Sequence, residues 1–416
     1  MAMKIVIATA VYYPMINGIA VFSHNLAVGL AKRGHEVLVL TPSQSGHKYT
    51  RTQDGVKVAY LKSSEVKVYP DQIHDVPPRK KIGKVELPRA FYKDGFKVAV
   101  FPKKSISKEL DKFKPDVIHV QVSDPIGLSC VAYAKAHGVP VVTTEHNQPE
   151  VITDPLGVPR IIKKPVNALL AVYMANRQSK SDYVTMPTQK AIDILLKRRD
   201  GLGVPMEAVS NGVDLVNFKP GVASDAIYKK YKIPRDVPVV LYVGRVDPEK
   251  NVGLLLRAFQ RVLIDVTSAI LVVVGDGVDR LRLEKEALYL GIADNVKFLG
   301  RVLPPNLYEL YKIGTVFATG SEVETQGIVL IEAAATGLPL IAVDKGAVSE
   351  VCCNGVNGFL CKPGAVDEIA SAMVRILSDK VLRRKFSKES VRIASEHDFE
   401  RTLDKFERIY QEVCEQ

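Results

Sequence analysis

The chain has 416 residues, a formal net charge of +11 and a hydrophobic content of 47%. Its length predicts two domains rather than one, and no stretch approaches the roughly 20 consecutive apolar residues that a membrane-spanning helix needs. The opening stretch MAMKIVIATAVYYP has a short apolar run, which indicates a first buried strand rather than a signal peptide. The five cysteines lack zinc-site or redox spacing, so we expect a reduced, cytoplasmic protein.

Basic residues are concentrated in one window of the chain. Between Arg79 and Lys104, nine basic residues stand against two acids, with large apolar residues between them. This mixture suits an anionic membrane surface, where each basic residue contributes about 1 kcal/mol. Residues 160–180 are similarly basic and amphipathic. The alternative is a solvated loop and an ordinary core-facing helix, and nucleic acid is not favoured because no binding motif accompanies the charge. The candidate acceptor- or membrane-contacting residues are Arg79, Lys80, Lys81, Lys84, Arg89 and His119.

Short apolar stretches alternate with amphipathic ones along the whole chain. Runs such as EVLVLTP and PVVLYVGR predict strands, and runs such as NVGLLLRAFQRVL predict helices. Val/Ile/Leu-rich strands between helices indicate parallel sheets covered on both faces. The pattern runs through twice, so we predict an α/β fold of two Rossmann-like, doubly wound domains at 1–210 and 237–390. A hinge at 211–236 would join them, with a C-terminal helix at 391–416 packing back on the first domain. Ligands of such sheets bind beyond the carboxyl ends of the strands, which predicts a cleft between the domains.

In the first domain, three positions follow predicted strands. Asn17–Gly18 forms a tight turn before a helix whose free amide groups suit an anion, unless the glycine serves the turn alone. His119 and His146 follow apolar runs and should emerge at the edge of the cleft, where an imidazole can bond a sugar hydroxyl or a phosphate. A structural role is the alternative for His119. The G-x-G-x-x-G fingerprint is missing, which argues against a dehydrogenase.

In the second domain, basic residues follow one predicted strand. Gly244 and Arg245 end that strand, and Lys250 stands just before a helix. Arginine offers a planar fork to phosphate oxygens and lysine a point charge, so the pair predicts a diphosphate site. The alternative is that Lys250 pairs with Glu249 or Asp247 on the surface. The loop after the next strand lets the backbone approach a ligand, and its residues are Gly275, Asp276 and Gly277.

The stretch SEVETQGIVLIEAAATG places two carboxylates eight positions apart. Glu324 lies in a predicted loop, and Glu332 lies inside the apolar helix that follows. A carboxylate on an apolar helix face is costly unless donors satisfy it, and the vicinal hydroxyls of a ribose would do so. Amide groups at the start of the helix are available for a phosphate. They belong to Gln326, Gly327, Ile328 and Val329.

This segment resembles the E-x7-E signature of retaining glycosyltransferases with the GT-B architecture, the family 4 type. The motifs NGVD, VGRVDPEKN and VGDG match that family in order and spacing, so the resemblance spans essentially the whole chain. It implies that Arg245 and Lys250 bind the donor diphosphate and that Glu332 binds the donor ribose. It also implies that Glu324 faces the sugar near its 3- and 4-hydroxyls.

The same resemblance assigns two positions in the first domain. Gly18 would form the loop under the phosphates, and His146 would bond the 6-hydroxyl of the sugar. The implied reaction is transfer from a nucleotide diphosphate sugar with retention, by a front-face route in which the leaving phosphate helps to deprotonate the acceptor. No metal or other cofactor is implied.

Two residues of these motifs resemble those of the diacylglycerol glycosyltransferases. Ile19 replaces a more usual second glycine, and Gln326 stands where many relatives have phenylalanine. The stretch TEHNQPE departs from that subgroup, which more often has Tyr-His-Thr there. We therefore expect transfer of glucose from UDP-glucose to a membrane lipid such as diacylglycerol, at the inner face of the cell membrane. The alternatives are a soluble or polysaccharide acceptor, or a nucleotide-sugar-binding protein without activity.

Overall fold

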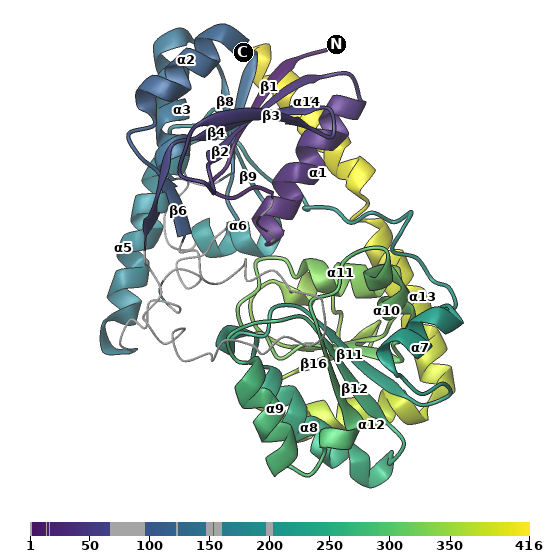
Figure 1. The fold of residues 1–416 in the computed structure, drawn as a ribbon. Helices are drawn as coiled ribbons and strands as arrows, with labels where there is room; N and C mark the ends of the chain where they lie inside the picture. Colours follow the sequence, from purple (N-terminus) through teal and green to yellow (C-terminus); the bar gives the residue numbers. More distant parts are fainter. Residues whose placement is uncertain are drawn as a thin grey trace. The chain divides into compact units, whose positions relative to one another are not determined.

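The computed structural model divides the chain into two compact units (Figure 1). Unit 1 comprises Met1–Val209 and Leu403–Gln416, and unit 2 comprises Ser210–Thr402. The residues expected as a hinge, 211–236, therefore lie inside unit 2. The structure describes residues 2–13, 15, 17–66, 96–121, 124–146, 153, 160–196 and 203–416. The basic-window residues that we expected to contact an acceptor or a membrane lie outside the described residues: Arg79, Lys80, Lys81, Lys84 and Arg89.

Unit 1 is built on an eight-stranded, mostly parallel sheet in the order β10-β9-β8-β7-β1-β2-β4-β3. Strand β3 pairs with β4 in the antiparallel direction, and β5 and β6 form a separate antiparallel pair. The apolar runs at β1, β2, β7 and β8 are buried, as expected for a sheet covered on both faces. The strands are β1 (Lys4–Ala8), β2 (Glu36–Pro42), β3 (Tyr49–Gln53), β4 (Val56–Leu61), β5 (Ser63–Val66), β6 (Phe96–Ala99), β7 (Val117–Val120), β8 (Val141–Thr144), β9 (Tyr183–Met186) and β10 (Met206–Ala208).

Two helices of unit 1 begin at side chains that cap them. Asn17 Oδ1 accepts the amide of Ala20 at 2.9 Å and starts α1, so Gly18 is the first helical residue rather than part of a tight turn. Asp124 starts α3 in the same way, with Pro125 at the first helical position. The C-terminal helix α14, drawn in yellow, lies beside α1 in Figure 1. The helices are α1 (Gly18–Lys32), α2 (Lys103–Phe113), α3 (Pro125–His137), α5 (Arg160–Gln178), α6 (Gln189–Leu196) and α14 (Phe399–Cys414), of which α14 enters unit 1 at Leu403.

Unit 2 contains a six-stranded parallel sheet in the order β13-β12-β11-β14-β15-β16. Alternate residues of β11 enter two different cores. Val240 and Tyr242 pack with residues of α8 and α12, whereas Leu241 and Val243 pack with residues of α10 and α11. Figure 1 shows these helix pairs on opposite sides of the strands. The strand is therefore apolar throughout because both of its faces are buried.

The unit 2 strands are β11 (Val239–Val243), β12 (Ile270–Val274), β13 (Val296–Gly300), β14 (Val316–Ala318), β15 (Leu340–Val343) and β16 (Gly358–Cys361). The α-helices are α7 (Asp225–Tyr231), α8 (Val252–Asp265), α9 (Arg280–Tyr289), α10 (Asn306–Ile313), α11 (Ile328–Ala335), α12 (Val366–Ser378) and α13 (Lys380–Ser395). Short 3-10 helices cover Pro248–Lys250, Ala293–Asn295 and Val348–Glu350. Within the ranges that the structure describes, no helix is long and apolar enough to cross a bilayer.

Candidate functional site

Three neighbouring strands of unit 2 end in the loops that the sequence analysis singled out. Strands β12, β11 and β14 are adjacent and parallel, so their carboxyl ends meet at one edge of the sheet. The loop after β11 carries Arg245 and Lys250, and the loop after β12 carries Asp276. The loop after β14 carries Glu324. This edge of the sheet is the candidate donor site.

The first two of these loops pack backbone against backbone. A Cβ atom on Gly275 would lie 1.7 Å from the carbonyl oxygen of Gly244, and a Cβ on Gly277 would lie 2.2 Å from that of Val246. The amide of Val246 also bonds the carbonyl oxygen of Asp276 at 3.0 Å. No side chain fits at either glycine, so the loops are held in one arrangement at the sheet edge.

Arg245 is held by two carboxylates of its own loop. Its guanidinium pairs with Asp247 and, at 2.5 Å, with Glu249. Asp247 is buried and also accepts the amide of Val278 at 3.1 Å. Burial raises the pKa of the Asp247 carboxyl, and the charge of Arg245 opposes that shift. The Arg245 side chain is 46% exposed, so a phosphate can reach the guanidinium.

Lys250 pairs with Glu324, not with the acids of its own loop. Its Nζ lies 2.6 Å from Oε1 of Glu324, and both side chains are largely buried. The loop after β14 approaches Lys250 closely, because a Cβ on Gly320 would lie 2.5 Å from the carbonyl oxygen of Asn251. The backbone of Glu324 is fixed by a 3.1 Å hydrogen bond from the amide of Ala347. Two residues expected separately at the site are thus in direct contact.

Glu332 lies one helical turn into α11 and is held by a buried tyrosine. Tyr311 of α10 donates its hydroxyl to Oε2 of Glu332 at 2.5 Å. Burial raises the pKa of Glu332 to about 7, and the hydrogen bond from Tyr311 opposes that rise. A carboxylate with such a pKa gains from any further donor, which is what the hydroxyls of a ribose provide.

The side chain of Gln326 ties the start of α11 to residues 210–211. Its Oε1 accepts the amide of Asn211 at 3.1 Å, and its Nε2 donates to Oγ of Ser210 at 2.6 Å. Gln326 is buried, and Gly327 follows it with a φ of 79°. Helix α11 then starts at Ile328, where the first amide groups have no acceptor within the helix.

In unit 1, His146 lies just beyond the carboxyl end of β8. Its Nε2 lies 2.8 Å from Oε1 of Gln121, and its ring packs against Phe22 of α1 at a centroid distance of 5.1 Å. Burial lowers the pKa of His146 to about 3, so the imidazole is neutral at physiological pH. His146 can therefore bond a hydroxyl, but it does not supply a positive charge.

The structure corrects our expectation for His119. This residue is the third of β7 and is fully buried, so it contacts neither an acceptor nor a membrane surface. Its ring is bonded to Tyr410 of α14 and to Thr144 of β8, each at 2.6 Å. The structural alternative holds, because α14 covers this part of the sheet.

Some residues that hold the candidate site side chains in place were not predicted from the sequence. Asp247 stood in a motif already quoted, and Gln121 lies two residues after His119, a spacing that puts both on one side of a strand. Tyr311 and Tyr410 carry no local signal, since they meet the site only through the tertiary fold. Groups of three or more metal-binding side chains are absent from the part of the chain that the structure describes.

Helix α5 exposes an apolar stripe on unit 1, which we define as Ile161, Ile162, Leu169, Val172 and Tyr173. Ile161 is 92% exposed and Leu169 is 71% exposed. The helix contains no acidic residue, whereas it contains two lysines and two arginines. The guanidinium of Arg177 lies 4.9 Å from the ring centroid of Tyr173. This surface is apolar at its centre and cationic around it.

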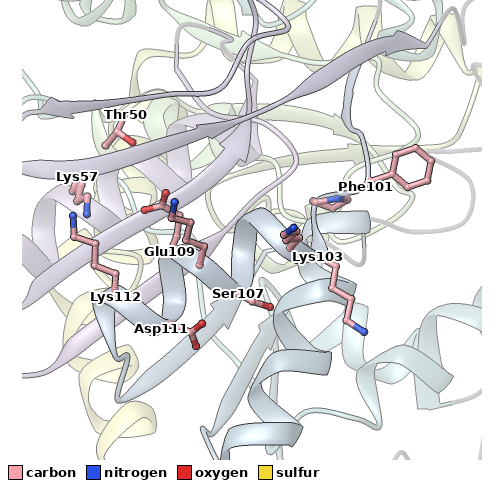
Figure 2. Close-up of a pocket in the computed structure, with 11 residues that line it drawn as sticks. Thr50, Lys57, Phe101, Lys103, Ser107, Glu109, Asp111 and Lys112 are labelled. Atoms are coloured by element: carbon pink, nitrogen blue, oxygen red, sulfur yellow. The ribbon is translucent and has the colours of Figure 1, made fainter.

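Helix α2 borders a hollow of about 1130 Å³ (Figure 2). Phe101, just before the helix, is 93% exposed and projects away from the strands. The two acids of the hollow are engaged, since Glu109 pairs with Lys48 at 3.0 Å and Asp111 accepts the hydroxyl of Tyr133 at 2.9 Å. Five lysines line the hollow and form no ion pair with any described residue: Lys57, Lys103, Lys104, Lys108 and Lys112.

Comparison with known families decides the class of this protein. The family described as "Glycosyltransferase Family 4" matches residues 16–217, and the family described as "Glycosyl transferases group 1" matches residues 223–392. The chain belongs to these glycosyltransferases. It is a retaining hexosyltransferase with the GT-B fold, which confirms the expected fold class and enzyme class.

The names of individual relatives of this glycosyltransferase describe different products. The chain is 26% identical to alpha-monoglucosyldiacylglycerol synthase of Acholeplasma laidlawii, over 93% of this chain and 92% of that protein. It is also 26% identical to N-acetyl-alpha-D-glucosaminyl L-malate synthase of Bacillus anthracis, over 96% and 95%. Among solved structures, sucrose-phosphate synthase of Thermosynechococcus elongatus has the same fold, with a TM-score of 0.75 at 19% identity over 98% of each chain.

Proposed function

We propose that this glycosyltransferase moves glucose from UDP-glucose to a membrane lipid such as diacylglycerol. The observation that carries the donor assignment is the contact of Lys250 with Glu324 at the sheet edge that also presents Arg245. Arg245 and Lys250 bind the diphosphate, and Glu332 binds the ribose. The donor-contacting backbone comprises Gly244, Gly275, Asp276, Gly277, Gln326, Gly327 and Ile328.

Two residues of unit 1 complete the proposed set. Gly18 lies at the start of α1, where free amide groups favour phosphate oxygens. His146 is neutral, so we assign it a hydrogen bond to the 6-hydroxyl of the transferred sugar. Glu324 faces the same sugar near its 3- and 4-hydroxyls, and its carboxylate is paired with Lys250.

The proposed reaction exchanges one bond at the anomeric carbon. The bond from this carbon to the diphosphate oxygen breaks, and a bond to the acceptor hydroxyl oxygen forms on the same face. The hydroxyl proton passes to the leaving diphosphate. Negative charge grows on that diphosphate in the transition state, where Arg245 and Lys250 stabilise it. This route retains the configuration of the sugar.

The choice of a lipid acceptor rests on the surface of unit 1. Relatives named for diacylglycerol and for malate are equally identical to this chain, so identity does not choose between acceptors. The apolar stripe of α5 lacks any acid and is surrounded by cations, which is the composition of a helix that lies in an anionic membrane interface. A second copy of this chain is a poor partner for the stripe, because it would bring like charges together.

The α2 hollow supports the same assignment. Its five lysines would each contribute about 1 kcal/mol near anionic headgroups, and the exposed ring of Phe101 can enter the interface. We therefore expect peripheral binding to the inner face of the cell membrane.

The test measures UDP release from UDP-glucose with and without vesicles of diacylglycerol and an anionic lipid. Release that requires the vesicles and yields a glycolipid supports both donor and acceptor. Slow release that is indifferent to vesicles moves the acceptor to a soluble compound or a polysaccharide. If UDP-glucose gives no release while GDP-mannose does, the donor assignment is wrong although the enzyme class stands.

A further inference from the structure

Four side chains of unit 1 form a continuous hydrogen-bonded chain from α14 to His146. Oη of Tyr410 lies 2.6 Å from Nδ1 of His119, and Nε2 of His119 lies 3.2 Å from Nε2 of Gln121. Oε1 of Gln121 lies 2.8 Å from Nε2 of His146. All four residues are buried, so each polar group depends on its neighbours in this series for its hydrogen bonds.

The position of the protons follows from the amide of Gln121. A primary amide donates from nitrogen and accepts at oxygen, so it presents opposite polarity to the two rings. Nε2 of His119 accepts and carries no proton, whereas Nε2 of His146 donates and carries one. Burial lowers the pKa of both rings to about 3, with each ring neutral at physiological pH and holding one proton. The proton of His119 is then on Nδ1, which donates to Tyr410, and the free lone pair of His146 is on Nδ1.

Thr144 fits the same arrangement. Its hydroxyl lies 2.6 Å from Nε2 of His119 and 2.6 Å from the hydroxyl of Thr185. Thr144 donates to the ring and accepts from Thr185, so Nε2 of His119 receives two donors. The reverse arrangement would require the amide of Gln121 to turn over and both rings to change tautomer together.

Aromatic packing fixes the planes of the two rings. Phe406 of α14 lies 5.0 Å from the ring centroid of His119 and 6.0 Å from that of Phe22. Phe22 in turn contacts the ring of His146. The rings are held by neighbours, and the hydrogen bonds decide which nitrogen is protonated.

We propose that Gln121 and Tyr410 are positioning residues that couple the tautomers of the two histidines and keep the proton of His146 on Nε2. The consequence for catalysis rests on the proposed function, in which His146 bonds a hydroxyl of the transferred sugar. Because Nδ1 of His146 carries no proton, it accepts a hydrogen bond from that hydroxyl. The other tautomer would present an N–H and reverse the bond.

The experiment compares the full-length wild type with Tyr410→Phe by NMR of 15N-labelled histidine, with the His146 signals assigned from His146→Asn. The wild type is expected to carry its proton on Nε2 of His146. Tyr410→Phe removes the acceptor for Nδ1–H of His119, so His119 moves its proton to Nε2 and turns the amide of Gln121. His146 then shifts to the Nδ1–H form, and kcat falls about five- to tenfold, the worth of about one hydrogen bond, with little change in the KM for the donor.

Two further variants control this result. Tyr133→Phe removes another tyrosine hydroxyl of unit 1, one that donates to Asp111, and should leave both histidines unchanged. Gln121→Glu offers an acceptor to both rings, so His119 should move its proton to Nε2 while His146 keeps its own on Nε2. This pattern separates the two histidines, which a general loosening of the fold would not do.

Four outcomes decide between the claims. The inference is overturned if wild-type His146 carries its proton on Nδ1, or if Tyr410→Phe leaves the tautomer of His146 unchanged. It is also overturned if Gln121→Glu changes neither ring. If the tautomers shift as expected while kcat does not change, the coupling stands and the role of His146 in the proposed function is wrong.

Discussion

The ammonium nitrogen of Lys250 lies 2.6 Å from a carboxylate oxygen of Glu324, although 74 positions separate the two residues. The pair forms because β11 and β14 are parallel neighbours whose loops meet at one edge of the sheet. The carboxylate holds the lysine ammonium in the candidate donor site, where the same loop after β11 also carries Arg245. The pair is thus expected to matter more for activity than for stability.

Replacing Lys250 with alanine should reduce kcat by about 100- to 1000-fold, because it removes a charge that stabilises the leaving diphosphate. The melting temperature should fall by only about 2–4 °C, as for the loss of about 1 kcal/mol. Activity assays and thermal unfolding check the two expectations.

The matched control is Lys312→Ala. Lys312 forms an equally short ion pair with Glu309 in unit 2, at 2.6 Å and with similar burial, but outside the candidate site. Lys312→Ala should have a melting temperature similar to that of Lys250→Ala but should keep nearly full activity. Equal activity losses in the two variants would contradict the donor assignment.

Nucleotide binding should release a proton from Glu332. Burial raises its pKa to about 7, so the carboxyl is partly protonated just below that pH. Hydroxyl groups of a ribose favour the ionised form and lower the pKa, so the complex holds fewer protons than the free protein. Affinity for UDP should therefore weaken as the pH falls below about 7. Calorimetry in buffers of different ionisation enthalpy measures the protons released.

Glu332→Gln is the control for this prediction, since it keeps the size of the side chain and cannot ionise. It should bind UDP more weakly, with no proton release. The wild type at about pH 8.5 should also release no proton from this group, because the carboxyl is already ionised. Equal release by wild type and variant near pH 6.5 would show that another group titrates, contrary to the assignment.

Gln326→Ala should lower the stability of unit 2 by about 1–3 kcal/mol, because it leaves the amide of Asn211 without its buried acceptor. Gln326→Glu keeps an acceptor oxygen at that place, so it should lower the stability of unit 2 by less than Gln326→Ala does. The thermal transition of each variant measures the difference. If Gln326→Glu is the less stable of the two, the hydrogen bond to Asn211 is not what holds this segment.

Charging the apolar stripe of α5 should weaken membrane binding. Leu169→Glu places an acid where an anionic interface would meet an apolar side chain, so co-sedimentation with anionic vesicles should fall at least tenfold. The control is Leu288→Glu on α9 of unit 2, which is 67% exposed against 71% for Leu169. If both variants bind vesicles like the wild type, the stripe is not the docking surface.

The local patterns of the sequence predicted most of the fold. Apolar runs located β1, β7 and β11, because strands buried on both faces are apolar at every position. The same reading placed Arg245 and Glu324 after strands, and parallel neighbours brought them to one edge. Antiparallel strand β3 was missed, since its polar sequence YTRTQ has no buried face.

The side chains that hold the site were harder to predict, because they come from distant parts of the chain. Tyr410 bonds His119 across 291 positions, and only the return of α14 to unit 1 explains why His119 is buried. Tyr311 reaches Glu332 from the preceding helix in the same way. Periodicity reports which face of an element is buried, but not which polar partner it meets there.

The most direct test of the account is the anomeric configuration and partition of the sugar product. The protein is incubated with UDP-glucose and vesicles of diacylglycerol with an anionic lipid, and the glucose is followed into organic and aqueous phases and examined by NMR. We expect an α-glucosyl lipid in the organic phase. A β-linked product would contradict retention, and glucose found only in the aqueous phase would contradict the lipid acceptor.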